Sequence, residues 1–302
     1  MKLEQIFREV SDLRGQVEGL SARMEALHRE FFSDGSLLSR RLKGRGLKIY
    51  RQNPPEKLLI PPDLPPDLTT QFYEKMKRYS FRLFLRDLVK TESPFCPHDL
   101  TQYCSSRVAE EYTRFLNTTS TVIPLTRNQY RLNRHGVSSF GPTLEWFVAQ
   151  MFQREFACPA TFGVHLKETD VGGDYDVLAP WEGRIIYVEA KSSPPKSIED
   201  PEINAFFLRL HDLIPDVALF FNDTHLRMMD KVIQIFKREM ERAPDRGLGA
   251  TPPEKLSDEI YHVDHWIYIL NSKRDIVANF SICLKDHLRM RRDFWALRTE
   301  CS

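Results

Sequence analysis

Two acidic residues and a lysine have the types and the spacing that hydrolysis of a phosphodiester bond requires. Side chains alternate in direction along a β-strand, so in the strand-like segment RIIYVEAKSS the side chains of Glu189 and Lys191 share one face. Asp176 lies thirteen residues before Glu189, on a segment that can pair with this strand as a hairpin across Trp181-Glu182-Gly183. Two converging carboxylates repel each other unless a cation lies between them, and all-oxygen ligands suit Mg²⁺ or Mn²⁺. The pattern therefore predicts a divalent-metal site, where Lys191 orients or deprotonates a water for attack on a phosphate.

Longer stretches around these residues follow a distinctive order. The segments GGDYDVLAP and IIYVEAKSS come after a helix that bears an acid (FGPTLEWFVAQMF) and before an apolar strand (DVALFFN). In this order, across roughly residues 136–280, they resemble the PD-(D/E)xK superfamily of restriction-endonuclease-like nucleases. The resemblance implies a site with Asp176 and Glu189 as metal-binding acids, Lys191 as the catalytic lysine, Glu145 as the first-helix acid and the backbone carbonyl of Ala190 as a further ligand.

Two alternatives stay open at this site. Tyr175 stands where the family has a proline, and Asp174 lies two residues before Asp176 on the same strand face, so either aspartate could be the first metal ligand. Glu189 and Lys191 could also form an exposed cross-strand ion pair, which contributes well under about 1 kcal/mol to stability.

The elements that must position these residues lie in residues 136–302. A helix from Thr143 is followed by three strand-like segments, a helix (PEINAFFLRLHDLI), a buried strand, a long helix and a further strand (HWIYILN). Helices interleaved with strands in this way predict an α/β fold, a restriction-endonuclease-like mixed sheet flanked by helices. We expect this nuclease domain to follow three smaller units.

Residues 71–135 resemble a winged helix-turn-helix. Three helical segments, the last of them SSRVAEEYTRFLNTT with Ser105-Ser106 as its cap, precede a β-ribbon (TVIPLTRNQYRLN). In that resemblance the third helix, with Arg107, enters a DNA major groove, while Arg127 and Arg131 on the wing contact the backbone. Glu110 and Glu111 on the same helix would repel phosphates, so a unit that binds protein or only packs on its neighbours is the alternative.

The first seventy residues divide into a heptad-patterned helix and a basic segment. Over residues 1–35 apolar residues recur at alternating steps of three and four, with Leu13 and Leu20 at d positions, which favours a parallel two-stranded coiled coil and hence a homodimer. Packing of this helix on its own domain is the alternative. Residues 36–70 carry a run of cations, including Arg40 and Arg41, followed by PPEKLLIPPDLPPDL, and predict a basic, stiff linker that could contact phosphates.

Composition excludes several classes of protein. The 43 Lys and Arg residues nearly balance the 42 Asp and Glu residues, so nucleic-acid affinity would have to come from local clusters of charge. Five scattered cysteines do not form a zinc or disulfide framework, which favours a cytoplasmic protein. The chain contains no apolar stretch of about 18 residues and no P-loop, so we expect neither a membrane span nor a nucleotide cofactor.

These observations together predict a Mg²⁺-dependent deoxyribonuclease, with Mn²⁺ able to substitute. The expected protein is a homodimeric endonuclease whose winged helix positions DNA for hydrolysis. A non-catalytic DNA- or protein-binding factor on a nuclease-like scaffold is the alternative from another class. RNA and branched DNA remain possible substrates on the sequence alone.

Overall fold

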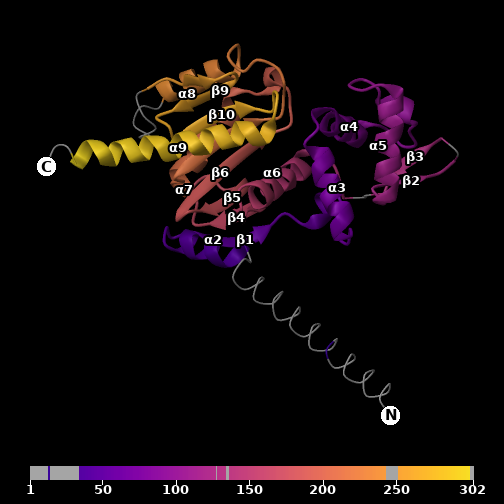
Figure 1. The fold of residues 1–302 in the computed structure, drawn as a ribbon, viewed down its shortest axis with the longest axis horizontal. Coiled ribbons are helices and arrows are strands. Elements are labelled where there is room, and N and C mark those ends of the chain that lie inside the picture. The colour runs from indigo at the N-terminus through magenta and orange to yellow at the C-terminus, as the bar shows by residue number, and fades with distance from the viewer. Residues whose placement is uncertain (1–12, 14–33, 127, 134–135, 243–250, 300–302) are drawn as a thin grey trace.

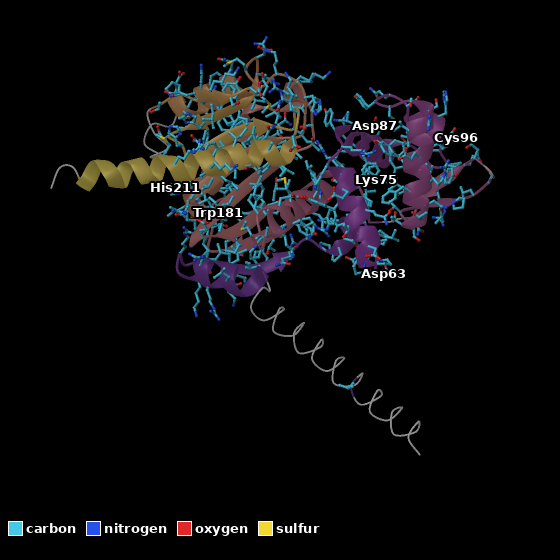
Figure 2. The ribbon with its side chains drawn as sticks, viewed as in Figure 1. Asp63, Lys75, Asp87, Cys96, Trp181 and His211 are labelled. Atoms are coloured by element: carbon cyan, nitrogen blue, oxygen red, sulfur yellow. The ribbon has the colours of Figure 1, made fainter. Side chains whose placement is uncertain are left out.

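The protein, in a computed structural model that describes Leu13 and residues 34–126, 128–133, 136–242 and 251–299, has a mixed α/β architecture. A large mixed sheet flanked by helices lies beside a smaller, mainly helical unit (Figure 1). Figure 2 marks the helical unit by Lys75 and Asp87, and the unit that contains the sheet by Trp181 and His211.

Within the described residues the large sheet contains eight strands. Across the sheet their order is β1 (Lys48–Gln52), β4 (Thr161–Lys167), β5 (Asp174–Trp181), β6 (Arg184–Lys191), β7 (Val217–Asn222), β10 (Ile267–Asn271), β9 (Ile260–Val263) and β8 (Glu254–Ser257). The strands β4, β5 and β6 pair antiparallel, whereas β7 pairs parallel with both β6 and β10. Parallel pairing needs a crossover connection, and α7 (Asp200–Leu213) provides it between β6 and β7.

The β5–β6 hairpin follows the predicted pattern. Val177 pairs with Val188 and Trp181 pairs with Arg184, so the turn falls at Glu182 and Gly183 as expected. Side chains of β6 alternate between two cores: Val188 and its even-numbered neighbours pack on one face and Tyr187 on the other. The predicted alternation along this strand is therefore confirmed.

Helices cover both faces of the sheet, as Figure 1 shows. The helices α6 (Gly141–Glu155) and α9 (Ile276–Thr299) contribute to the core on one face. The core on the other face is built from α2 (Asp34–Lys43), α7 and α8 (Val232–Arg242). The catalytic candidates thus lie on strands that are held between two apolar layers.

The smaller unit contains the helical segments and the β-ribbon that the sequence predicts for residues 71–135, in the expected order. They are α4 (Tyr79–Lys90), η2 (Pro97–Leu100), α5 (Ser106–Thr118), β2 (Val122–Pro124) and β3 (Tyr130–Leu132). A further helix, α3 (Pro66–Met76), begins in the stretch that the sequence predicts to be a linker. Ser105 caps α5, because its hydroxyl accepts a hydrogen bond from the backbone N–H of Val108 at 3.4 Å. The role of this unit as a DNA-binding winged helix stays a prediction.

The structure differs from the expectation of a linker over residues 36–70. Apolar residues Leu38, Leu42 and Leu47 are buried against the sheet, and β1 pairs antiparallel with β4 to form an edge of the sheet. The basic residues hide this pattern in the sequence, because they occupy the solvent-facing positions of a short helix and an edge strand. Residues 36–52 are therefore part of the α/β unit.

The predicted coiled-coil helix over residues 1–35 lies almost wholly outside the described residues. Among the helices that the structure describes, none combines the length and hydropathy that a membrane crossing needs.

Candidate active site

Asp176 and Glu189 occupy opposing positions on β5 and β6. The strand register pairs Val177 with Val188, so the next residues toward the open end of the hairpin are these two acids. Oδ2 of Asp176 accepts a hydrogen bond from the backbone N–H of Ala190 at 2.7 Å. The side chains are almost fully buried, with Asp176 9% and Glu189 1% exposed. The hairpin thus brings both predicted metal-binding acids into one buried place.

The carboxylate of Glu189 lies among three donors. Nζ of Lys191 lies 2.8 Å from Oε1, and Nη1 of Arg209 on α7 lies 3.2 and 3.1 Å from the two oxygens. The hydroxyl of Tyr187 also donates to Oε2. An unpaired buried carboxylate would be very costly, and these three contacts offset the burial of the Glu189 side chain.

Glu145 reaches the same place from α6. Its side chain is 7% exposed, and among the described residues Oε2 has no hydrogen-bond partner. Burial, with repulsion from Asp174 and Glu189, raises the pKa of Glu145 to about 8. Burial and the same kind of repulsion, from Glu189 and Glu145, raise the pKa of Asp176 well above its usual range. Four acids therefore crowd together, which is the electrostatic setting that a bound cation would relieve.

Asp174 is held by a residue of the segment that follows β1. Nδ2 of Asn53 donates to Oδ2 of Asp174 at 3.0 Å. Burial raises the pKa of Asp174, but the hydrogen bond from Asn53 and nearby positive charges outweigh this, so the net pKa lies below its usual value. Asp174 and Glu145 line a cavity of ≈ 270 Å³ beside the acid cluster, together with Lys57, Ser138 and Ser139. Asp174 is thus an ionised acid at the site, and the choice between Asp174 and Asp176 as first ligand stays open.

Lys191 is a cation at this site. Burial alone would lower the pKa of Lys191. The negative charges of Glu189 and Asp176 raise it by more than burial lowers it, so the net pKa lies above the usual value. The side chain is 23% exposed and so reaches the edge of the site. This charge suits contact with a phosphate or protonation of a leaving oxygen, in place of the proton abstraction that the sequence also allowed.

The donors fit a hard divalent cation. Carboxylate oxygens are the ligands that Mg²⁺ and Mn²⁺ prefer, and four side chains offer them here: Asp176, Glu189, Asp174 and Glu145. Within the described structure, Oε2 of Glu145 accepts no hydrogen bond. The raised pKa values of Glu145 and Asp176 indicate missing positive charge at the same place. The residues present therefore match the group that the family resemblance implies.

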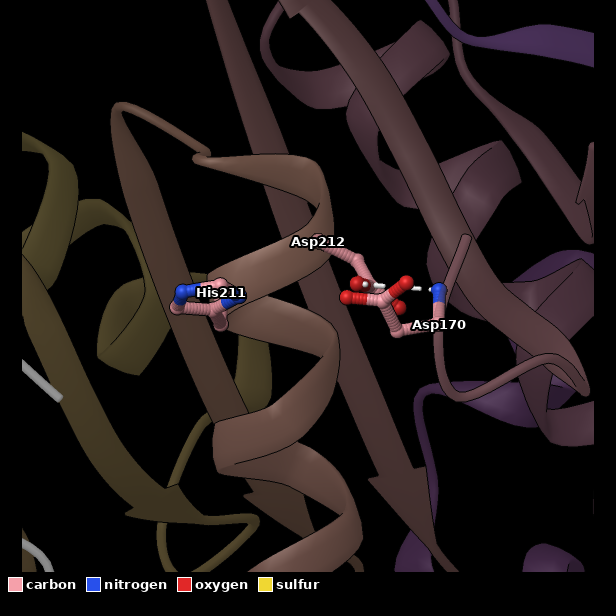
Figure 3. A group of neighbouring side chains, drawn as sticks. All are labelled: Asp170, His211 and Asp212. Carbon is pink, nitrogen blue, oxygen red and sulfur yellow. Dashed lines mark hydrogen bonds between the residues drawn. The ribbon is translucent and has the colours of Figure 1, made fainter. Parts of the chain in front are cut away.

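A second acidic group lies at the C-terminal end of α7. Potential ligand atoms of Asp170, His211 and Asp212 lie within 4.8 Å of one another (Figure 3). The oxygens of Asp212 already accept backbone N–H groups of Asp170 and Val171 at 3.2 and 3.0 Å. This group therefore ties the β4–β5 connection to α7, and we assign it no chemistry.

The arginines expected at nucleic acid are spread over the molecule. Arg107 is exposed on α5, and Arg131 is half-buried on β3, which lies with β2 on the side of α5 away from the large sheet (Figure 1). Arg127 lies outside the described residues. Arg41 on α2 donates to the carbonyl of Gly183, so it and its neighbour Arg40 lie at the far end of β6, about 20 Å along the strand from Glu189. The structure therefore brings Asp176, Glu189, Lys191 and Glu145 together, and none of the four arginines that it describes lies with them.

Sequence reasoning missed Asn53, Lys57 and Arg209. Asn53 and Lys57 follow an edge strand that looked like a linker, and Arg209 lies on the outer helix of the β6–β7 crossover. A period of three to four residues along α7 could have placed Arg209 on the face toward the sheet, because it lies between the buried residues Phe206 and Leu210. Lys57 and Asn53 carry no comparable signal.

No protein-family model and no curated protein sequence matches the chain. Among solved structures, the fold is similar to protein VC1899 from Vibrio cholerae, with a TM-score of 0.43 and 16% identity over 70% of this chain. It is also similar to Can2 from Sulfobacillus thermosulfidooxidans in complex with cyclic tetra-adenylate, with a TM-score of 0.43 and 13% identity over 82% of this chain. The chain spans 56% and 59% of the lengths of those two proteins. Likenesses of this degree identify neither a family nor an activity, so the assignment below depends on the chain's own geometry.

Proposed function

We propose that the protein is a metal-dependent nuclease that hydrolyses phosphodiester bonds of DNA. The observation that carries the proposal is the buried convergence of Asp176 and Glu189 on paired strands, with Lys191 one strand step beyond Glu189. Two acids and a lysine in this arrangement agree with the family resemblance of the sequence. The approach of Glu145 from the preceding helix agrees with it as well.

Each residue has a role that its surroundings support. Asp176, Glu189 and the backbone carbonyl of Ala190 would hold Mg²⁺ or Mn²⁺, and the ion would supply a Lewis acid that neutralises charge on the phosphate. Lys191, charged and partly exposed, contacts the phosphate and donates a proton toward the leaving oxygen. Glu145, which approaches the same place from α6, would help to orient the metal ion or the attacking water.

The helical unit is proposed to position the DNA. Arg107 on α5 and Arg131 on β3 would contact phosphates, as in the winged-helix resemblance of this unit. Duplex DNA is therefore the first substrate to test, before RNA and branched DNA.

One observation favours the scaffold alternative. Glu189 is already paired with Arg209 and Lys191, so its charge is balanced within the protein itself. A protein that keeps this pairing could bind nucleic acid or protein without cutting. Calorimetric titration with Mn²⁺ separates the two functions, because the nuclease must bind the ion through Asp176 and the scaffold need not.

The decisive experiment is incubation of the purified protein with supercoiled, linear, single-stranded and branched DNA and with RNA, in Mg²⁺, Mn²⁺ or EDTA. We expect ion-dependent cleavage of DNA that is abolished in Asp176→Ala and Glu189→Ala, and binding without turnover in Lys191→Ala. Glu254→Ala, which removes an exposed acid on β8, is the matched control and should cut normally. Undiminished cleavage by both acid variants would refute the site, and binding without cleavage under every condition would support the scaffold.

A further inference from the structure

A short segment from outside the β4–β7 core enters the active site. After β1 the chain forms the turn of η1 (Pro55–Lys57) at the cavity beside the acid cluster. Asn53 and Lys57 line that cavity together with the acids Asp174 and Glu145. The site is therefore completed by residues more than eighty positions before Glu145 in the sequence.

Asn53 is held in place from several directions. Its side chain is 8% exposed, its Nδ2 donates to Asp174, and its backbone N–H donates to the carbonyl of Gly163 at 2.8 Å. Gly163 has φ +57°, and a Cβ there would lie 2.6 Å from the Cβ of Asn53. Only glycine, which has no Cβ, leaves room at this position for the side chain of Asn53, so the position of Asn53 is determined by the fold.

Lys57 extends from this fixed point. Its Nζ lies 3.3 Å from Oδ1 of Asn53, and its side chain is otherwise exposed to solvent. A single long hydrogen bond to a neutral amide leaves most of the capacity of an ammonium group available, since that group has three donors. Lys57 therefore offers positive charge at the mouth of the cavity.

The cavity is lined by chemically different groups. Glu145 and Asp174 offer carboxylates, while Lys57, Asn53, Ser138 and Ser139 offer an ammonium, an amide and two hydroxyls. Acids attract a cation, whereas the other groups donate hydrogen bonds to an anion. A cavity of ≈ 270 Å³ with this mixed lining suits a phosphate group that contacts both a divalent cation at the acids and the ammonium of Lys57.

We propose that this cavity receives a phosphate group of the nucleic-acid strand being cut, and that Lys57 is its protein contact. The proposal rests on the proposed function, because it takes the same acids as the place where that strand is hydrolysed. It adds a positively charged residue from the edge of the sheet that the core motif does not include. Asn53 is the positioning residue that holds Lys57 and Asp174 in register with each other.

The test measures binding of a short DNA duplex by the full-length protein as a function of salt, with Ca²⁺ present. Each lost phosphate contact lowers the slope of log K against log[salt] by about one unit. We expect this decrease in Lys57→Ala, the wild-type slope in Lys57→Arg, and no change in Lys255→Ala. Lys255 is the matched control, because it is exposed on β8, at the edge of the sheet opposite to β1.

Cleavage kinetics provide a second readout. Loss of a contact that is equal in the ground and transition states raises KM and leaves kcat unchanged. We therefore expect Lys57→Ala to raise KM about tenfold, with rescue by Lys57→Arg. A wild-type salt slope in Lys57→Ala, or an equal decrease in Lys255→Ala, would overturn the proposal. A protein that binds with a Lys57-dependent slope but never cuts would refute hydrolysis and support the phosphate contact.

Discussion

Arg82 on α4 and Asp223, the residue after β7, form an ion pair that is almost completely buried. Their side chains are 1% and 3% exposed, and the guanidinium contacts both carboxylate oxygens at 2.8 to 3.0 Å. The remaining nitrogen of Arg82 donates to the backbone carbonyls of Met76 and Lys77. The backbone N–H of Asp223 donates to the carbonyl of Lys191 at 2.7 Å. The helical unit is thus joined to the sheet directly beside the proposed catalytic lysine.

This buried ion pair predicts a large loss of stability in Arg82→Ala. Removing one partner of a buried ion pair leaves the other charge unpaired, and such changes typically cost about 3–5 kcal/mol. We expect a decrease of this size in the free energy of unfolding, measured by urea denaturation. Replacing both residues, as Arg82→Met with Asp223→Leu, should be much less destabilising, because no unpaired charge remains.

An exposed ion pair provides the control for that prediction. Arg274 and Asp258 lie 2.8 Å apart, with side chains 71% and 47% exposed. Exposed pairs contribute little, since water screens both charges, so Arg274→Ala should leave the denaturation midpoint close to that of the wild type. Equal losses of stability in Arg82→Ala and Arg274→Ala would contradict this interpretation of the buried ion pair.

The raised pKa of Glu145 predicts how the stability of the ion-free protein depends on pH. Its pKa is about 8 in the folded protein against an ordinary value of 4.5, so the folded state binds a proton that the unfolded chain has released between these values. The free energy of unfolding therefore falls as pH rises from about 4.5 to about 8. In EDTA, Glu145→Gln should make this fall shallower, as measured by urea midpoints at each pH. Identical pH profiles for the two proteins would show that Glu145 is not crowded by other acids.

The helical unit predicts the salt dependence of DNA binding. Neutralising Arg107 and Arg131 together should lower the slope of log K against log[salt] by about one to two units, because each arginine would lose a phosphate contact. Arg242→Ala is the comparison, since Arg242 is exposed at the end of α8, on the opposite side of the sheet from α6. An unchanged slope in the double variant would indicate that this unit binds protein or only packs on the sheet.

Much of the α/β unit could be predicted because its signals are local. The alternation around Val188 and the short turn at Glu182 and Gly183 define the β5–β6 hairpin, and the hairpin alone brings Asp176 opposite Glu189. The cap at Ser105 is likewise a local signal, because a serine hydroxyl before a helix satisfies a free backbone N–H. The strands β8 and β9 were not predicted, since their short segments near the end of the chain lack a clear period.

The remaining parts of the site come from contacts between distant residues. Arg82 and Asp223 are separated by 141 positions, and Asn53 and Asp174 by 121, so no spacing in the sequence marks either pair. Arg209 pairs with Glu189 from helix α7. The sequence pattern indicates the apolar face of this helix but not its polar contact with Glu189. Charges that meet only after folding determine which acid is ionised, and a local pattern contains no information about them.

The heptad pattern of residues 1–35 predicts a homodimer. Of these residues the structure describes only Leu13 and the start of α2. Leu13 is 60% exposed in the single chain, and an apolar stripe left in water costs about 25 cal/mol per Å². Deleting residues 1–32, or placing Glu at both Leu13 and Leu20, should therefore convert dimers into monomers in light scattering. Because one site of this kind cuts one strand at a time, loss of the dimer should slow double-strand cutting of a plasmid more than nicking. A wild-type protein that is monomeric at micromolar concentration would refute the coiled coil and assign this helix to packing on its own chain.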